Sequence, residues 1–401
     1  MITYKAFKFR LYPTNEQELT LVQWIGCGRY IWNHFLQKNI EKYKFDKKFI
    51  FKTEMSADVV KLKKELTWLN EPPAFVLLNK LTNLETALKR AFKKISSFPT
   101  FKSKHSDTSG ISIGQLNNHI KFCQNSIIIP KIGPIKYIKH RNITGEFKSI
   151  TIRKQNNRWF VICLCKITKD ITNKSDIILG IDLGIKEFAI TSDGQIFDNP
   201  RHMEKKQKLL TRRQRQLSKK QKHSNRREKK RRQISKLHYH VRMQRHDYLH
   251  QTSREITNSC DILVLENLNI KGMMKNKNLS RSIGQVGWST FINYCKYKIE
   301  DRGGSLFLID RFYPSSQLCS CCGSRKKMLL SQRTYECNNC GLVLDRDFNA
   351  AINIKKYYTT HGTWGSYAHG ENDQSIEYSI DQVNSMKCEK FFINNKEAVT
   401  R

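Results

Sequence analysis

Two apolar runs in this chain each end in an acidic residue. Residues 177–181 precede Asp182, and residues 262–265 precede Glu266. Short continuous apolar runs of this kind are typical of buried strands. A carboxylate at the end of a central strand is costly to bury unless it is paired or binds a metal ion. The two runs therefore predict an α/β fold with an acidic site at the end of neighbouring strands.

A third acidic cluster follows much later, in the sequence Asp345-Arg346-Asp347-Phe348-Asn349. Any of the acids alone could simply cap a turn or a helix. Their joint order, an Asp strand, a hairpin, a long helix and a Glu strand, is the order of an RNase H-like core. We predict Asp182, Glu266 and Asp347 as a site for Mg²⁺, which prefers oxygen ligands, with Asp345 as the alternative third ligand. Two such ions about 4 Å apart are a standard device for cutting phosphodiesters.

Four cysteines between the last two clusters have the spacing of a metal site. Two Cys-x-x-Cys pairs are each followed by a glycine, which favours the tight turn of a zinc knuckle. Four thiolates at this spacing predict a closed structural Zn²⁺ site. The predicted ligands are Cys319, Cys322, Cys337 and Cys340; the adjacent Cys321 is a rival that lacks the two-residue spacing. The other seven cysteines show no comparable pairing, which indicates packing.

The charge balance points to a polyanionic partner. The chain has 401 residues, with 72 Lys+Arg against 35 Asp+Glu, for a net charge of +37. A globular protein this basic is expected to bind nucleic acid. No apolar run approaches the length of a membrane span, and the N-terminus does not resemble a signal peptide. We therefore expect no membrane partner and a location in the prokaryotic cytosol, associated with the nucleoid.

The cations are most concentrated in the predicted helical segment 201–258. Residues 201–245 hold 19 Lys+Arg and only two acids. A solvated helical hairpin is the alternative interpretation, but so many cations without acidic partners repel one another, so we predict contact with nucleic acid. The expected contact residues are Arg212, Arg213, Arg215, Lys219, Lys220, Arg226, Arg227, Lys229, Lys230, Arg231 and Arg232.

The N-terminal half predicts a different architecture. Residues 2–12 alternate like a strand, residues 14–95 have helical spacing after the capping-box pair Thr14 and Gln17, and residues 110–168 read as short strands with turns. This order predicts a small β-barrel or sandwich with a helical bundle inserted after its first strand. A polar stretch at 169–176 then reads as a linker.

These motifs together resemble the TnpB family, the transposon-encoded RNA-guided nucleases related to type V CRISPR effectors. The resemblance runs along nearly the whole chain and depends on motifs in a fixed order. They are Lys8 to Thr14, Asn33 to Leu36, Phe98 to Lys104, Gly180 to Lys186, Glu266 to Leu268, Ser316 to Gly323, Cys337 to Gly341 and Asp345 to Ile354.

The resemblance implies a multi-domain α/β chain whose nuclease domain is RNase H-like (RuvC). It also implies the catalytic carboxylates Asp182, Glu266 and Asp347. The implied domains are a wedge-like β-barrel (1–13 and 98–170), a helical recognition insertion (14–97), the RuvC domain (171–312 and 343–358), a zinc ribbon (313–342) and a polar tail expected to be disordered (359–401).

The function implied is that of an Mg²⁺-dependent, RNA-guided DNA endonuclease. Its guide is an RNA from the transposon end, and its target is double-stranded DNA beside a short adjacent motif, with base pairing reading the sequence. Two other classes are open on the residues: a non-cleaving nucleic-acid-binding regulator of transposition, and a transposase proper that joins strands with the same metal chemistry. A guide RNA bound to the purified protein would separate a nuclease from a transposase.

Overall fold

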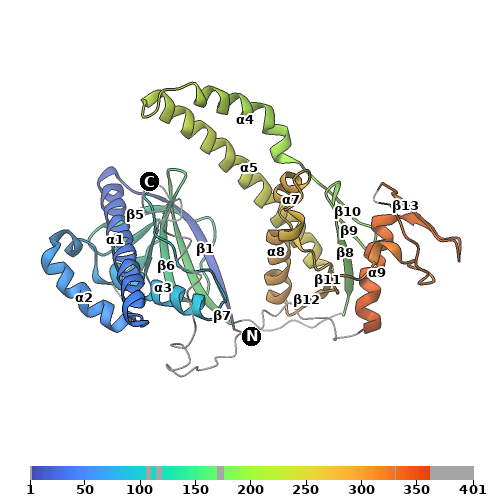
Figure 1. Ribbon diagram of the computed structural model, residues 1–401, viewed down its shortest axis with the longest axis horizontal. Helices are drawn as coiled ribbons and strands as arrows, with labels where there is room; N and C mark the ends of the chain where they lie inside the picture. The colour runs from blue at the N-terminus through green and yellow to red at the C-terminus, as the bar shows by residue number, and fades with distance from the viewer. Residues whose placement is uncertain (1, 105–109, 114–119, 169–175, 330, 362–401) are drawn as a thin grey trace. The chain divides into compact units, whose positions relative to one another are not determined.

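The computed structural model describes residues 2–104, 110–113, 120–168, 176–329 and 331–361. The chain divides near residue 170 into two compact units, whose elements are drawn in Figure 1. In the described residues, no helix is both long and apolar enough to cross a membrane. The predicted linker at 169–176 lies, except for its last residue, outside the described residues.

The first unit contains a seven-stranded antiparallel sheet. Its strand order is β2-β6-β7-β1-β5-β4-β3. The sheet curls around a single core, to which all its longer strands turn one face. The ring of Phe122 on β3 also stacks on Phe147 of β6, with the ring centroids 4.9 Å apart, although these strands are not neighbours in the sheet. The bounds are Ile2–Tyr12 (β1), Gly110–Ile113 (β2), Lys121–Phe122 (β3), Ser126–Ile129 (β4), Gly133–Ile138 (β5), Glu146–Gln155 (β6) and Arg158–Thr168 (β7).

The predicted helical insertion lies between β1 and β2. It comprises α1 (Asn15–Asp46), α2 (Lys52–Glu65), the short helix η1 (Thr67–Asn70) and α3 (Ala74–Phe92). Thr14 and Gln17 form the predicted capping box at the start of α1. The insertion has its own apolar core, which includes Phe35, Leu81 and Leu88. The helical prediction for residues 14–95 is therefore confirmed in three separate helices.

The second unit is built on a five-stranded mixed sheet. The strand order is β10-β9-β8-β11-β12, in which β8, β11 and β12 are parallel and β9 and β10 are antiparallel to their neighbours. The bounds are Ile178–Leu183 (β8), Glu187–Thr191 (β9), Ile196–Asp198 (β10), Ile262–Leu265 (β11) and Ser305–Leu308 (β12). The two predicted apolar runs thus become adjacent parallel strands at the centre of this sheet.

Helices cover both faces of this sheet. Helices α5 (Asn225–Asn258) and α8 (Trp288–Asp301) bury one face, where Ile181 and Leu265 belong to their core. Helix α9 (Arg346–His361) packs on the other face, where Ile354 and Val264 belong to one buried cluster. Figure 1 shows α8 and α9 on opposite sides of the strands. Successive side chains of a strand point to opposite faces of the sheet. Alternate residues of β8 and β11 therefore face α9, and the residues between them face α5 and α8.

The predicted basic segment 201–258 is a helical hairpin rather than one helix. Helix α4 (His202–Ser218) ends before a turn at 219–224, and α5 follows. A small core that includes Leu210, Ile234 and Leu237 joins the two helices. Two short helices, α6 (Ile270–Met273) and α7 (Ser280–Val286), come between β11 and α8.

The structure adds detail near the C-terminus. Strands β13 (Thr334–Glu336) and β14 (Val343–Asp345) form a hairpin that crosses the predicted domain boundary at 342 and ends at the residue before α9. Helix α9 continues to His361, so residues 359–361 are helical rather than part of a tail. The remainder of the predicted tail, 362–401, lies outside the described residues.

Gly180 should be essential to the second unit, because α9 crosses β8 there at very short range. A Cβ atom at Gly180 would lie 2.4 Å from the Ala351 carbonyl oxygen and 2.5 Å from the Lys355 backbone nitrogen. We expect Gly180→Ala to lower the free energy of unfolding by about 3 kcal/mol, as overpacking does, in urea unfolding followed by circular dichroism. The control is Gly284→Ala, whose added methyl would meet only Met274 at 3.6 Å. Equal stability of the two variants would contradict the assignment.

Candidate metal centres and nucleic-acid surface

Strand parity places the two strand-end carboxylates on the α9 face of the sheet. Gly180 faces α9, so Asp182, two residues on, faces the same way. Glu266 stands in the same relation to Val264, which is in the α9-side core. Since the carboxyl ends of parallel strands meet at one edge, the two acids are neighbours there. Both are half-buried.

A polar residue from the next loop fixes Glu266. The hydroxyl of Ser315 donates to Glu266 Oε1 at 2.5 Å. Ser315 begins the short helix η2 (Ser315–Gln317), which follows β12 and packs against α9. Sequence reasoning missed Ser315, although its place just after the third parallel strand was a usable signal.

The structure separates the roles of the two C-terminal acids. Asp345 is the N-cap of α9, because its Oδ1 accepts hydrogen bonds from the backbone nitrogens of Asp347 at 2.9 Å and Phe348 at 3.0 Å. Asp347 lies in the first helical turn, with its side chain 18 % exposed. The cap therefore explains Asp345, and Asp347 is the acid that faces the sheet edge.

Burial and neighbouring carboxylates shift the pKa of two of these acids. Burial raises the pKa of Asp182 well above its ordinary value, and the nearby charges of Glu266 and Asp347 raise it further. Burial also raises the pKa of Glu266, although its hydrogen bond from Ser315 works in the opposite direction. Buried carboxylates whose pKa is raised in this way are a common mark of a functional site.

Two arginines that sequence reasoning missed partly neutralise this site. Arg346 Nε donates to Asp347 Oδ1 at 3.0 Å, and Arg333 Nη1 lies 3.3 Å from Asp347 Oδ2. Arg346 also lowers the pKa of Asp182. Arg333 comes from just before β13, 14 residues earlier in the chain, so no local spacing signalled it. Asp347 is thus paired with one cation of its own helix and with another just before the β13–β14 hairpin.

The donor set of the acidic site fits a hard divalent cation. All three candidate ligands are carboxylates, which Mg²⁺ favours. Within the described residues, however, the only group of three or more His, Cys, Asp or Glu side chains whose ligand atoms all lie within 4.8 Å is a cysteine cluster. The carboxylates are neighbours rather than a closed cage, as expected while they repel one another and Asp347 pairs with arginine.

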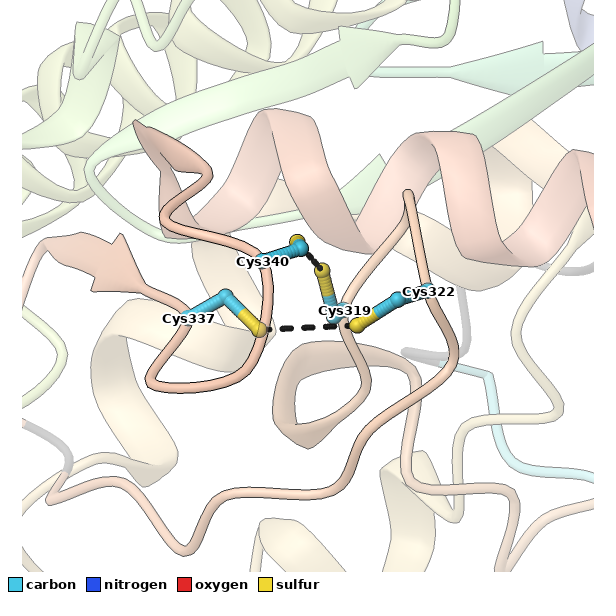
Figure 2. Close-up of side chains that lie close together, drawn as sticks. All are labelled: Cys319, Cys322, Cys337 and Cys340. Carbon is cyan, nitrogen blue, oxygen red and sulfur yellow. Dashed lines mark hydrogen bonds between the residues drawn. The ribbon is translucent and has the colours of Figure 1, made fainter.

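That cysteine cluster consists of the four predicted ligands (Figure 2). Cys319 Sγ lies 3.5 Å from Cys340 Sγ, and Cys322 Sγ lies 3.6 Å from Cys337 Sγ. Zinc–sulfur bonds of about 2.3 Å in a tetrahedron place sulfurs about 3.8 Å apart, so the geometry can hold a structural metal ion.

The two knuckles that carry these cysteines are built alike. The backbone nitrogens of Gly323 and Gly341 each donate to the first cysteine carbonyl of their pair at 3.0 Å. Both glycines have positive φ, 73° and 72°. A hydrogen bond from the Asn339 side chain, with further help from the backbone at Ser324, lowers the pKa of the Cys322 thiol to about 6. Such a thiol is ready to ligate a metal ion as thiolate. Cys321 is exposed and outside the cluster.

The basic hairpin divides into two kinds of cation. Arg213 Nη1 donates to the Gln233 carbonyl at 3.2 Å, and Arg227 Nη1 donates to the carbonyls of Leu217 and Lys220, both at 3.0 Å. These two predicted contact residues brace the hairpin. Arg231 and Arg232 share Glu228 as an acidic partner. The other predicted contact residues lie on the same two helices, except Lys219 and Lys220, which lie in the turn between them.

Comparison with known proteins places this geometry in a family. A family model described as "Probable transposase" matches residues 163–277, and one described as "Cas12f1-like, TNB domain" matches residues 288–354. A "Helix-turn-helix domain" description matches residues 1–48, although these residues form β1 and α1. A relative from Streptomyces pristinaespiralis, named "Putative RNA-guided DNA endonuclease", is 32% identical over 357 residues, which cover 87% of this chain and 88% of the relative.

The chain belongs to the TnpB family. A second relative is "Putative RNA-guided DNA endonuclease InsQ" of Escherichia coli (strain K12). It is 31% identical over a match that covers 87% of this chain and 91% of the relative. Among solved structures, the Cas12f1–sgRNA–target DNA complex aligns with a TM-score of 0.56 at 14% identity, covering 88% of this chain and 99% of that one. That likeness shows a shared mixed α/β fold.

The TnpB cysteine cluster should bind about one metal ion per chain. Cys322→Ser should lose that ion and leave the β13–β14 hairpin open to proteolysis, because three thiolates no longer close the site. The matched control is Cys321→Ser, which changes the adjacent cysteine outside the cluster. Elemental analysis of the purified variants and limited proteolysis measure both effects. Loss of the metal ion in Cys321→Ser alone would reverse the ligand assignment.

Without metal, the stability of the second unit should fall as the pH rises. The folded-state pKa of Asp182 lies above its ordinary value of 3.8. The folded state therefore holds this proton more tightly than the unfolded chain, and stability is lost from about pH 4 upward through the raised pKa. In EDTA at pH 8, Asp182→Asn should be about 1–3 kcal/mol more stable than the unchanged protein. Urea unfolding at pH 5 and pH 8 measures this, with the exposed Asp176→Asn as control; a destabilised Asp182→Asn would contradict it.

Proposed function

We propose that this chain is an RNA-guided DNA endonuclease that hydrolyses target DNA with Mg²⁺ at Asp182, Glu266 and Asp347. The observation that carries the proposal is the meeting of three carboxylates at one edge of a sheet in a chain of net charge +37. An acidic edge on so basic a protein suits a cation-dependent reaction on a polyanion. The names of the TnpB relatives support the same activity.

The strand order supports an RNase H-like, RuvC type of nuclease domain. A hairpin of β8, β9 and β10 followed by parallel β11 and β12 is the order we expected for that core. We further assign the curled sheet of the first unit as the wedge-like barrel, its helices as the recognition insertion, and the cysteine cluster as a zinc ribbon. Zn²⁺ would be the structural ion, since four thiolates are its usual closed ligand set.

The residues of the site have distinct tasks in this mechanism. Bound Mg²⁺ supplies activation of water and stabilisation of the leaving 3′ oxygen. The hydroxyl of Ser315 orients the Glu266 carboxylate, and the α9 cap at Asp345 fixes the turn that carries Asp347. Arg333 and Arg346 hold Asp347 while no metal ion occupies the site, which keeps the ligand near its working position.

The cations of α4 and α5 would hold the nucleic-acid backbone. A guide RNA from the transposon end would pair with one DNA strand, so that base pairing reads the sequence and the protein reads backbone shape and a short adjacent duplex motif. A single acidic site would have to cut the two DNA strands in turn. Phosphate contacts through Lys and Arg make such binding sensitive to salt.

The decisive experiment purifies the protein co-expressed with its transposon end, sequences the bound RNA, and offers matched plasmid libraries with Mg²⁺ or EDTA. We expect one discrete RNA and Mg²⁺-dependent double-strand cuts. Asp347→Asn should lower the cleavage rate by a factor of about 10³ or more, because it removes a metal ligand. Asp345→Asn keeps a good helix cap and should cut at close to the unchanged rate.

The other outcomes identify the rival functions. Bound RNA without cutting of any matched target would indicate a non-cleaving regulator of transposition. Strand joining without a bound RNA would indicate a transposase. If Asp345→Asn lost cleavage while Asp347→Asn retained it, with equal folding, the ligand assignment would be reversed.

A further inference from the structure

A cavity of 260 Å³ lies in the second unit, and none of the three acidic residues lines it. Its walls come from the turn after β8, the start of α4, one side of α5, and α7. This volume is just below the roughly 300 Å³ at which sites for drug-sized ligands begin. It is therefore of a size to enclose one small planar ligand rather than a stretch of polymer.

The polar lining of the cavity carries positive charge without matching acids. Arg242 is half-buried, and no hydrogen bond or ion pair with another described residue fixes its guanidinium. Arg245 points its Nη1 at the carbonyls of Gly284 and Gln285, at 3.1 Å and 3.3 Å, which anchors it at the α7 wall. The one acid in the lining, Glu204, is exposed. The cavity therefore favours an anionic ligand over a cation.

A half-buried imidazole in the same lining has one buried, unsatisfied nitrogen. His202 Nε2 is buried and has no hydrogen-bond partner among the described residues. Burial, with the nearby charge of Lys205, lowers the pKa of His202, so the ring is neutral near pH 7. An unpartnered buried polar atom costs free energy, and a ligand that supplied the missing partner would recover it.

One part of the wall is apolar and aromatic. Phe188 and Tyr248 meet edge to face with their centroids 5.3 Å apart, and the Tyr248 hydroxyl is already engaged by the Asp198 carbonyl at 2.5 Å. Val241 and Val286 complete this wall. A surface of this kind accepts the face or edge of a nucleobase, while the guanidinium of Arg242 suits a phosphate.

We propose that this cavity binds a single nucleotide, with its phosphate on Arg242, its base against the apolar wall, and a polar group of the ligand on His202 Nε2. The same chemistry is present in a nucleotide flipped out of the bound RNA and in a free mononucleotide. The RNA source rests on the proposed function, whereas the free source does not. Either source would give Arg242 and His202 Nε2 the polar partners that they lack among the described residues.

Two variants test the proposal by different routes. Arg242→Gln removes the phosphate partner, and Ser282→Trp fills the cavity from the α7 side without changing its charge. The control is Arg254→Gln, which removes one exposed cation from the same helix α5 outside the cavity. Circular dichroism checks that all three variants fold, so lost binding is not lost structure.

The first measurement is titration of RNA-stripped protein with each of the four 5′ mononucleotides and with inorganic phosphate. We expect saturable binding of at least one nucleotide, weakened about tenfold or more in Arg242→Gln, as the loss of a charge-assisted hydrogen bond predicts. Ser282→Trp should abolish it, and Arg254→Gln should bind as the unchanged protein does. Phosphate binding as tightly as every nucleotide would overturn the proposal in favour of a simple anion site.

The second measurement is chemical probing of the co-purified RNA on each protein. If the ligand is part of the RNA, one nucleotide should be protected at its base on the unchanged protein and on Arg254→Gln, and exposed on both cavity variants. Neither measurement depends on DNA cleavage, so failure of the proposed nuclease function leaves both readable. No nucleotide binding and no changed RNA position in either cavity variant would overturn the proposal.

Discussion

The function proposed for the second unit rests on three carboxylates at one edge of its sheet, two of which have a raised pKa. Asp182 and Glu266 lie at the ends of adjacent parallel strands, so the spacing of the strands keeps their backbones close together. Asp347 joins them from α9, and its charge raises the pKa of both. A fold would not retain such a cluster for stability, because each buried like charge lowers it. The cluster makes sense as the binding site of a cation.

The close approach of α9 to β8 is what makes the cluster possible. Only a residue without a side chain fits where Gly180 meets the backbone of Ala351 and Lys355. That approach puts the first turn of α9 beside the strand ends, and the Asp345 cap fixes the direction of the turn. Three features therefore act together to place the third acid: Gly180 in β8, the Asp345 cap and Asp347 itself. They come from two segments far apart in the sequence.

The sequence predicted this site where the signal was local. Asp182 and Glu266 could be placed because an apolar run implies a strand and parallel strands share a carboxyl edge. The choice between Asp345 and Asp347 needed the cap hydrogen bonds, since both residues occur at the start of the same helix. Arg333 was missed because it reaches the site through the fold and not through spacing, whereas the place of Ser315 after the third parallel strand was a signal that was not used. The break in the basic segment at 219–224 and the helical residues 359–361 were missed because polar residues mark helix ends poorly.

Charge in the second unit is left unbalanced in two opposite ways. The acids at the sheet edge lack a full complement of cations, even with Arg333 and Arg346 beside Asp347. The hairpin of α4 and α5 has an excess of positive charge instead. Glu228 pairs with two arginines, and these helices hold far more cations than acids. These opposite charges do not neutralise one another, because one set is fixed at the strand ends and the other lies along the hairpin. Both excesses are relieved together only when a cation binds the acids and a polyanion binds the hairpin, so the two ligands that balance this protein are the two that nucleic-acid cleavage requires.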